Sequence, residues 1–430
     1  MNDDSLFGQL SFLMSMAFAA ALVLGLLLKF WLATRQMRHV AAHRAEVPAA
    51  FASQISLCAH QKAADYTLVL ARFGMLELAW GAAVLLAWTL LGGLSWLNQT
   101  LLQWLQPGLG QQVALLASFT AIGAVIDFPF TLYKTFVIEQ RFGFNKTTPK
   151  LWLQDLLKSL VLGALLGLPL ITLVLWMMGT TGALWWLWTW CVWMGFNLLM
   201  LLLYPTLIAP WFNQFKPLDN PELKDRVTSL MARCGFTSKG FFVMDGSKRS
   251  AHANAYFTGF GASKRVVFYD TLLEQLTPGE VDAVLAHELG HFKHRHILKR
   301  IVSMFALSLL GFALLGWLSG QAWFYIGLGV IPNLRGANDA LALLLFMMVL
   351  PLFSTFISPL FAQLSRKHEF EADAYAVAQT SGADLRSALL KLYKDNASTL
   401  TPDPVYVKFY YSHPPASERL GRMLGSAAPA

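Results

Sequence analysis

The sequence predicts a multi-pass α-helical membrane protein that also carries a smaller part of mixed α and β structure. Composition is the first observation behind this class, because 56% of the 430 residues are hydrophobic and 13% are charged. A soluble domain carries about a quarter charged residues. The second observation is that nearly uncharged apolar runs recur along the chain, and about 20 apolar residues are enough to cross a bilayer.

Seven apolar stretches are expected to cross the membrane as helices. The first of them contains no charged residue. The apolar piece Trp323–Ile331 is too short to cross alone, so we expect it to extend the sixth span or to re-enter. The expected spans are Leu10–Leu28, Phe73–Leu97, Val113–Thr131, Ser159–Met178, Ala183–Leu203, Ile301–Leu318 and Ala340–Leu360.

Basic residues are concentrated in two loops between the expected spans, Lys29–Lys62 and Tyr133–Lys158. The loop between them, Gly92–Gln112, is uncharged. The positive-inside rule therefore places the basic loops in the cytoplasm and the N-terminus outside. With seven spans, the segments 210–300 and 362–430 also lie on the cytoplasmic side. The same rule accounts for the net charge of +8, so we expect no nucleic-acid partner.

These spans divide the chain into four expected parts. Cys58, Cys191 and Cys234 are scattered among them without paired spacing, which indicates neither a disulfide framework nor a thiolate zinc site. The parts are an amino-terminal membrane region with five transmembrane helices (1–209), a soluble-looking segment (210–300), a pair of transmembrane helices (301–361) and a carboxy-terminal segment (362–430).

Short patterns within 210–300 predict its mixed structure. The run LKDRVTSLMARCG indicates an amphipathic helix that Gly235 ends. The runs GFFVMD, NAYFTGFG and KRVVFYD indicate short strands bounded by Gly and Asp. A further helix should follow, because Thr277 can cap it, Pro278 suits its first position and Glu280 completes a capping box.

This last helix carries the motif His-Glu-x-x-His, with His287 and His291 four residues apart. Residues at i and i+4 lie on one helix face, so the two imidazoles can converge on one zinc ion. Glu288 comes off the same side and is a candidate general base, since zinc lowers the pKa of water to about 7. The alternative is that the motif arises by chance on a solvated helix.

A catalytic zinc ion needs a third protein ligand, and the run SRKHEFEADAYA supplies the strongest candidates. Glu369 and Asp373 are four residues apart and share a helix face. One carboxylate could ligate zinc while the other hydrogen-bonds a ligand histidine. The alternative is a solvated helix start in which Glu369 pairs with Arg366 or Lys367.

Other polar residues near these motifs are expected to be bystanders. His294 and His296 do not continue the histidine motif, and we expect both to be solvated or to lie at the membrane surface. Glu371 points away from Glu369 and is expected to face solvent. His368 is a lesser candidate ligand, and His252 is expected to be a strand residue.

Three longer runs resemble the type I CAAX prenyl proteases, a family of integral-membrane zinc metalloendopeptidases. They are HANAYFTGFGASKRVVFYDTLLEQLTPGEVDAVLAHELGHFKHRH, SRKHEFEADAYA and YYSHPPASERL. Upstream, DFPFTLYKTFVIEQRFGFNKTTPKLWLQD resembles the family's loop before the fourth span. The likeness extends from about Asp65 to the end of the chain, in the family's order and with its number of spans.

The resemblance implies a role for each motif residue. His287 and His291 match the family's histidine ligands, and Glu369 matches the third zinc ligand. Glu288 matches the general base. Asp373 matches the acid that hydrogen-bonds a ligand histidine.

The resemblance also implies residues that face the substrate. His413 would hydrogen-bond the scissile carbonyl or its oxyanion, although the residues alone favour a turn before two prolines. Asn254, Ala255 and Tyr256 would pair with the substrate as an added strand, the alternative being an ordinary hairpin strand. Arg419 could support Asp373 or the substrate.

For the whole chain, the resemblance implies seven transmembrane helices that enclose a water-filled chamber and a cytoplasmic α+β zincin-like metalloprotease domain. Glu77 and Asp127 lie within or beside apolar spans and would face the protein interior or water. The implied cofactor is one Zn²⁺ per chain. The implied substrates are CAAX-type prenylated or other membrane-associated peptides, cleaved near the C-terminus. The oligomeric state stays open.

Two other functions compete with this interpretation. Heat-shock-type quality-control metalloproteases share the histidine motif but have fewer spans before it. A zinc transporter would use His287 to His296 as a relay, but its ligands should lie near mid-span. The C-terminal run GSAAPA lacks an ER-retrieval signal, which favours a bacterial inner membrane over the ER membrane.

Overall fold

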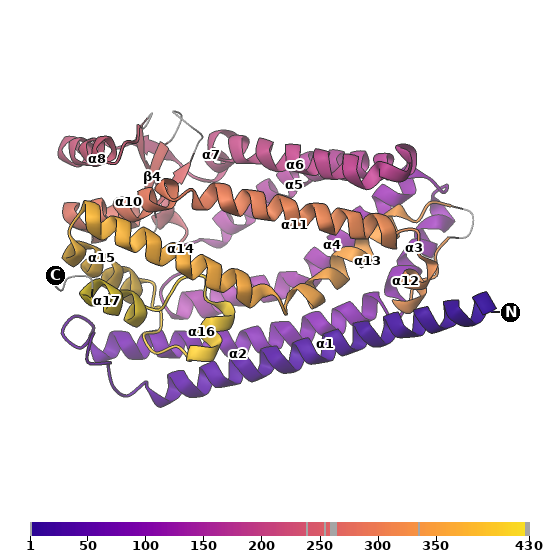
Figure 1. Cartoon of the computed structure of the whole chain (residues 1–430), viewed down its shortest axis with the longest axis horizontal. Helices are drawn as coiled ribbons and strands as arrows, with labels where there is room; N and C mark the ends of the chain where they lie inside the picture. Colours follow the sequence, from indigo (N-terminus) through magenta and orange to yellow (C-terminus); the bar gives the residue numbers. More distant parts are fainter. Residues whose placement is uncertain (1, 238–239, 253–254, 259–264, 334–335, 426–430) are drawn as a thin grey trace.

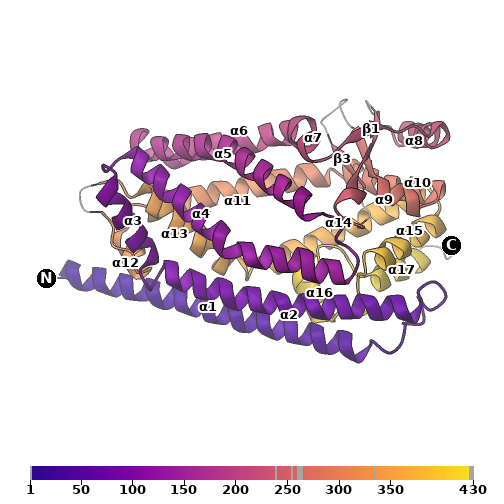
Figure 2. The ribbon, with the colours of Figure 1, turned by 180° about the vertical axis from the view of Figure 1, so that it is seen from behind.

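The long helices of the computed structural model run along one axis, and the sheet gathers with several shorter helices at one end of the molecule (Figure 1). The N-terminus lies at the other end, as the view from behind also shows (Figure 2). The structure describes residues 2–425 except 238–239, 253–254, 259–264 and 334–335.

Six helices in the described residues are long and apolar enough to cross a membrane, and a bent pair raises this number to seven. The helices of the amino-terminal half are α1 (Asn2–Ala42), α2 (Leu57–Trp88), α3 (Gly93–Trp104), α4 (Leu109–Tyr133), α5 (Pro149–Thr180), α6 (Trp185–Leu203) and α7 (Ala209–Phe212). Those of the other half are α8 (Pro221–Arg233), α9 (Asp270–Gln275), α10 (Pro278–Lys293), α11 (His296–Leu318), α12 (Ala322–Gly327), α13 (Asp339–Ser354), α14 (Ser358–Gln379), α15 (Gly382–Asp395), α16 (Pro404–Tyr410) and α17 (Ala416–Gly425).

The expected spans are confirmed as helices, but two of their boundaries are wrong. The second does not continue to Leu97, because α2 ends at Trp88 and Gly92, with φ +80°, starts the separate helix α3. The seventh is bent by 66° between α13 and α14. The short apolar piece forms α12, which packs on α1 through a 2.7 Å hydrogen bond from Ser15 Oγ to the Gly327 carbonyl.

The soluble-looking segment forms a four-stranded sheet in the order β1-β2-β4-β3. β1 pairs antiparallel with β2, β2 runs parallel to β4, and β3 pairs antiparallel with β4. The sequence patterns located three of these strands but missed β1. β3 is the last strand in this order. The strands are β1 (Phe215–Pro217), β2 (Phe241–Met244), β3 (Ala255–Thr258) and β4 (Arg265–Tyr269).

Two main buried cores lie at the two ends of the molecule, and a cavity of about 1810 Å³ extends between them. One core packs α10 against α8, α15 and β4, and the other packs α13 against α3, α4 and α12. Side chains from α4, α5, α11 and α13 line the cavity toward the second core. Glu77 and Asp127 are exposed on α2 and α4 and do not line it. The enclosed, water-filled chamber stays a prediction.

Gly290 determines how closely α10 approaches α14. A Cβ atom at Gly290 would lie 2.9 Å from the Cα of Ala372, which is closer than packed atoms tolerate. Only glycine therefore allows the two backbones to cross at this distance. The crossing brings the histidine motif of α10 against the acidic residues of α14.

Candidate metal centre

The start of α10 is built by the capping box that the sequence predicts. The Thr277 amide donates to Glu280 Oε2 over 2.7 Å, and the Thr277 hydroxyl accepts from the Glu280 amide. Lys391 Nζ on α15 donates to the same Glu280 carboxylate over 2.7 Å. The helix then continues to Lys293, so His287 and His291 lie one turn apart on one face.

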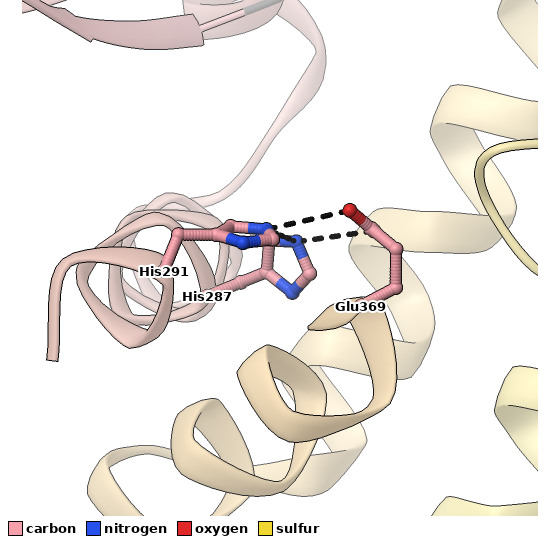
Figure 3. Close-up of side chains that lie close together, drawn as sticks. All are labelled: His287, His291 and Glu369. Atoms are coloured by element: carbon pink, nitrogen blue, oxygen red, sulfur yellow. Dashed lines mark hydrogen bonds and ion pairs between the residues drawn. The ribbon is translucent and has the colours of Figure 1, made fainter. Parts of the chain in front are cut away.

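Three potential ligand atoms converge where α10 crosses α14 (Figure 3). The Nε2 atoms of His287 and His291 are 3.3 Å apart. Glu369 places its Oε2 atom 3.5 Å from His287 Nε2 and its Oε1 atom 3.4 Å from His291 Nε2. The alternative that Glu369 pairs with Arg366 or Lys367 in solvent is wrong, because Glu369 is buried.

These atoms fit a zinc ion. Tetrahedral bonds of about 2.0–2.1 Å place neighbouring ligand atoms about 3.3 Å apart, close to the distances found here. Glu369 Oε2 is buried and has no hydrogen-bond partner among the described residues. A buried carboxylate oxygen without a donor is costly, and a bound cation removes that cost.

On the α14 side, His287 is held by a buried ion pair. Its Nδ1 atom lies 2.9 Å from Asp373 Oδ1, and Arg419 Nε donates to Asp373 Oδ2 over 2.8 Å. Burial alone would lower the pKa of His287, but Asp373 and Glu369 outweigh it and raise this pKa to about 9. A carboxylate on Nδ1 leaves Nε2 as the nitrogen that faces a metal ion. Burial likewise opposes the charge of Arg419, but Asp373 raises its pKa.

On the other side, His291 is held by a relay that the sequence did not predict. His291 Nδ1 lies 3.0 Å from Nδ1 of His296, and His296 Nε2 lies 2.8 Å from Oε2 of Glu371. His296 is only 4% exposed, so the prediction that it is solvated is wrong, whereas the alternative that it lies at the level of the membrane surface stays a prediction. Glu371 does not simply face solvent, since it accepts this hydrogen bond. His294 is exposed, as expected.

Glu288 and His413 both line the cavity beside the three ligand candidates. His413 Nε2 lies 3.4 Å from Glu369 Oε1, although the side chain is 65% exposed. The hydroxyl of Tyr393 donates to the Pro414 carbonyl over 3.1 Å, which fixes the turn after His413. The turn therefore presents His413 to the site.

The edge strand β3 carries two of the three residues that were expected to pair with the substrate as a strand. Ala255 and Tyr256 lie on this strand and line the cavity together with the histidine motif. Burial raises the pKa of Tyr256 to about 12. Asn254 lies outside the described residues. His252 precedes the strand instead of lying on it, and its Nδ1 contacts Asn396 Oδ1 at 3.0 Å, away from the three ligand candidates.

Comparison with known proteins places the chain among zinc metalloproteases. The family model "CAAX prenyl protease N-terminal, five membrane helices" matches residues 36–214, and "Peptidase family M48" matches residues 217–426. The chain is 37% identical to a CAAX prenyl protease 1 homolog of Arabidopsis thaliana over 313 residues, or 72% of each chain. It is 36% identical to CAAX prenyl protease 1 of Saccharomyces cerevisiae over 324 residues, covering 72% of this chain and 71% of the yeast protein.

A solved structure agrees with these matches. The crystal structure of S. mikatae Ste24p superposes with a TM-score of 0.88 at 30% identity, covering 95% of this chain and 99% of that one. The predicted multi-pass helical fold with a metalloprotease domain is therefore confirmed, and so is the predicted resemblance.

Proposed function

Because the chain belongs to peptidase family M48 and carries the membrane region of the CAAX prenyl proteases, we propose that it cleaves prenylated CAAX-type peptides at the α10–α14 crossing. The chain is a membrane zinc metalloendopeptidase. Three features go beyond family membership: the role of each site residue, the lipid on the substrate and the side of the membrane that the site faces.

One observation carries the residue roles. The Nε2 atoms of the two motif histidines and the Glu369 carboxylate lie 3.3–3.5 Å apart and face the cavity that Glu288 also lines. His287, His291 and Glu369 would hold one zinc ion. When bound, this ion would polarise the scissile carbonyl and make a water molecule acidic enough to attack it.

Glu288 acts as the general base. Its carboxylate takes a proton from the attacking water and delivers it to the nitrogen of the leaving amine. Such proton transfers contribute about 10²- to 10⁴-fold to the rate. Asp373 transfers no proton in this scheme. Its two oxygens contact His287 and Arg419, and its role is to orient His287.

His413 stabilises the oxyanion. An N–H at its Nε2 atom would donate to the carbonyl oxygen as negative charge develops there. Because the side chain is 65% exposed, it can reach the substrate without leaving its turn.

The cavity and strand β3 support the substrate proposal. β3 is the last strand in the sheet order, and an extended peptide would add to the sheet beside it through backbone hydrogen bonds, with Ala255 and Tyr256 close to the bond to be cleaved. The cavity continues from the metal centre between apolar side chains that include Leu307, Phe312 and Met347. A prenyl chain attached near the peptide's C-terminus would be buried there.

The metal centre would face the cytoplasm. The basic residues Arg35, Arg38 and Arg44 lie where α1 ends and the next loop begins, at the same end of the molecule as α10 (Figures 1 and 2). Clustered Arg and Lys beside transmembrane helices mark the cytoplasmic face. A bacterial inner membrane fits this orientation.

The test is cleavage of one CAAX peptide, farnesylated and unmodified, by wild type and by Glu288→Gln, with products identified by mass spectrometry. The zinc content of both proteins is measured first. We expect Glu288→Gln to keep its zinc and to lose about 10²- to 10⁴-fold in rate. A zinc-loaded Glu288→Gln protein that cleaves like wild type would overturn the mechanism. Equal rates on the two peptides would overturn the proposed preference for a prenylated substrate but not the assignment as a metalloprotease.

A further inference from the structure

A second group of potential metal ligands lies on the outer side of His291. His294, His296 and Glu371 each place one ligand atom so that all three lie within 4.8 Å of one another. We propose that these residues form a second divalent-metal site, which binds Zn²⁺ more weakly than the first and inhibits it. Two imidazoles and one carboxylate are a donor set that zinc commonly takes.

The backbone brings these histidines together at an unusual turn. Arg295 adopts the left-handed conformation, with φ 56° and ψ 32°, between the end of α10 and the start of α11. This conformation costs a non-glycine residue roughly 1–2 kcal/mol. The turn places the rings of His294 and His296 nearly parallel, with centroids 5.5 Å apart, beside Glu371 of α14.

The site has a fixed inner ligand and an open outer side. His296 is buried, and the ring of His368 stacks on it at 4.0 Å, which fixes the plane of its imidazole. His294 is exposed and the Glu371 side chain is 32% exposed, so an ion can enter from water.

Nearby positive charge explains why this site should bind metal more weakly than the first. Lys367 Nζ lies 3.9 Å from Glu371 Oε1 and competes for the carboxylate. Lys293 and Arg295 flank His294 in the sequence and repel a cation. At the first site Arg419 Nη1 also lies 3.8 Å from Glu369 Oε2, but that oxygen is buried and has no hydrogen-bond partner among the described residues. A bound cation removes the cost of this buried oxygen, whereas the partly exposed Glu371 carboxylate can be solvated by water instead.

His296 would couple the two sites. This step depends on the proposed function, in which His291 binds the catalytic zinc through Nε2 and keeps a proton on Nδ1. His296 Nδ1 then accepts a hydrogen bond from that N–H, and His296 Nε2 donates one to Glu371. An outer ion on His296 Nε2 moves the His296 proton to Nδ1. Two N–H groups would then face each other across 3.0 Å, which weakens the orientation of His291.

The test counts zinc ions bound to the full-length protein, purified in detergent without a histidine tag. Equilibrium dialysis against rising Zn²⁺, followed by atomic emission spectrometry, is applied to wild type, His294→Ala and the matched control Lys293→Ala. We expect wild type and Lys293→Ala to bind two zinc ions per chain and His294→Ala to bind one. Peptidase activity at low zinc should be unchanged in both variants. The zinc concentration that halves activity should rise about tenfold or more in His294→Ala.

Two results would overturn the proposal: a wild type that binds one zinc ion at every concentration, or a second ion that His294→Ala retains. Glu371→Gln provides a second variant if His294→Ala fails to fold, and it should also lose the second ion. Failure of the catalytic assignment is a separate outcome. If Glu369→Gln still binds the first zinc ion, the assignment of the catalytic ligands is wrong, and this result does not depend on whether a second ion binds.

Discussion

The two histidines of the motif are held in different ways, although they lie one turn apart on the same helix. His287 contacts Asp373, whose charge is neutralised by Arg419, and Asp373 and Arg419 are only 4% and 6% exposed. His291 contacts His296, whose relay ends on Glu371 at the edge of solvent. The first arrangement contains full charges and is closed, whereas the second is open and contains a full charge only at its outer end.

This difference separates two tasks. A buried ion pair is costly to break, because removing one partner leaves the other charged and unpaired away from water. The closed side should therefore contribute to folding as well as to metal binding. Loss of a hydrogen bond on the open side leaves no buried charge without a partner. We therefore expect the open side to affect metal affinity more than the free energy of unfolding.

The largest effect is expected from Arg419→Gln on the closed side. The substitution leaves the buried Asp373 carboxylate with His287 as its one remaining side-chain partner among the described residues. We expect the free energy of unfolding to fall by about 3–5 kcal/mol and zinc affinity to fall by up to about 100-fold. Thermal unfolding in detergent and competition with a zinc-binding dye measure the two quantities, and Arg419→Lys should restore part of both.

Arg44→Gln is the matched control, because Arg44 makes the same forked contact with Asp65 at 2.7 and 2.8 Å on the surface. Both side chains of that pair are 41% exposed, so its loss should cost far less stability than loss of the buried pair. If the two variants lost equal stability, burial of the Asp373–Arg419 pair would not be the cause.

A smaller effect is expected from His296→Phe on the open side. Phenylalanine keeps the ring that stacks on His368 but removes the acceptor for His291 and the donor to Glu371. Zinc affinity should fall by about tenfold, while the free energy of unfolding should fall by about 1 kcal/mol. The same dye competition and thermal unfolding report both values.

His368→Phe is the control for the open side, since it changes the stacked ring and leaves the relay in place. It should bind zinc as wild type does. A loss of stability in His296→Phe as large as that in Arg419→Gln would erase the distinction between the two sides.

The sequence predicted those parts of the centre that depend on spacing within one helix. His287 and His291 share a face of α10, and Glu369 and Asp373 share a face of α14, because residues four apart always do so. The capping box at Thr277 was equally local. The apolar runs likewise gave the helices of the membrane region, because bilayer thickness determines their length.

The relay through His296 depends on tertiary packing, which spacing does not reveal. It requires the left-handed turn at Arg295 and the close crossing at Gly290, which together bring His296 to Glu371. A glycine inside a strongly helical motif was the one available signal, because such a position often marks close backbone approach. The three-residue strand β1 was missed because it has no strong local pattern. The bend between α13 and α14 does have a local signal, since Pro359 lies in the first turn of α14, and that signal was missed.

The smallest effect on the metal centre is expected from Glu280→Gln, at the opposite end of α10. This substitution tests whether the two sides differ through their side chains or through the stability of the shared helix. Glu280 ties α10 to α15 through Lys391 and Ser387, whose hydrogen bonds measure 2.7 and 2.6 Å. We expect a loss of about 1 kcal/mol at pH 7 and unchanged zinc affinity.

The pH dependence of this loss identifies its origin. Burial alone would raise the pKa of Glu280, but the hydrogen bonds from Lys391 and Ser387 outweigh it and hold this pKa below its usual value. A carboxyl with a lowered folded-state pKa stabilises the fold above its unfolded pKa of about 4.3, and this contribution disappears as the pH falls through the folded value. The difference in thermal unfolding between wild type and Glu280→Gln should therefore shrink below about pH 4.3. A difference that stayed constant down to lower pH would assign the loss to packing of the side chain, and altered zinc affinity at pH 7 would show that both halves of the centre depend on the start of the helix.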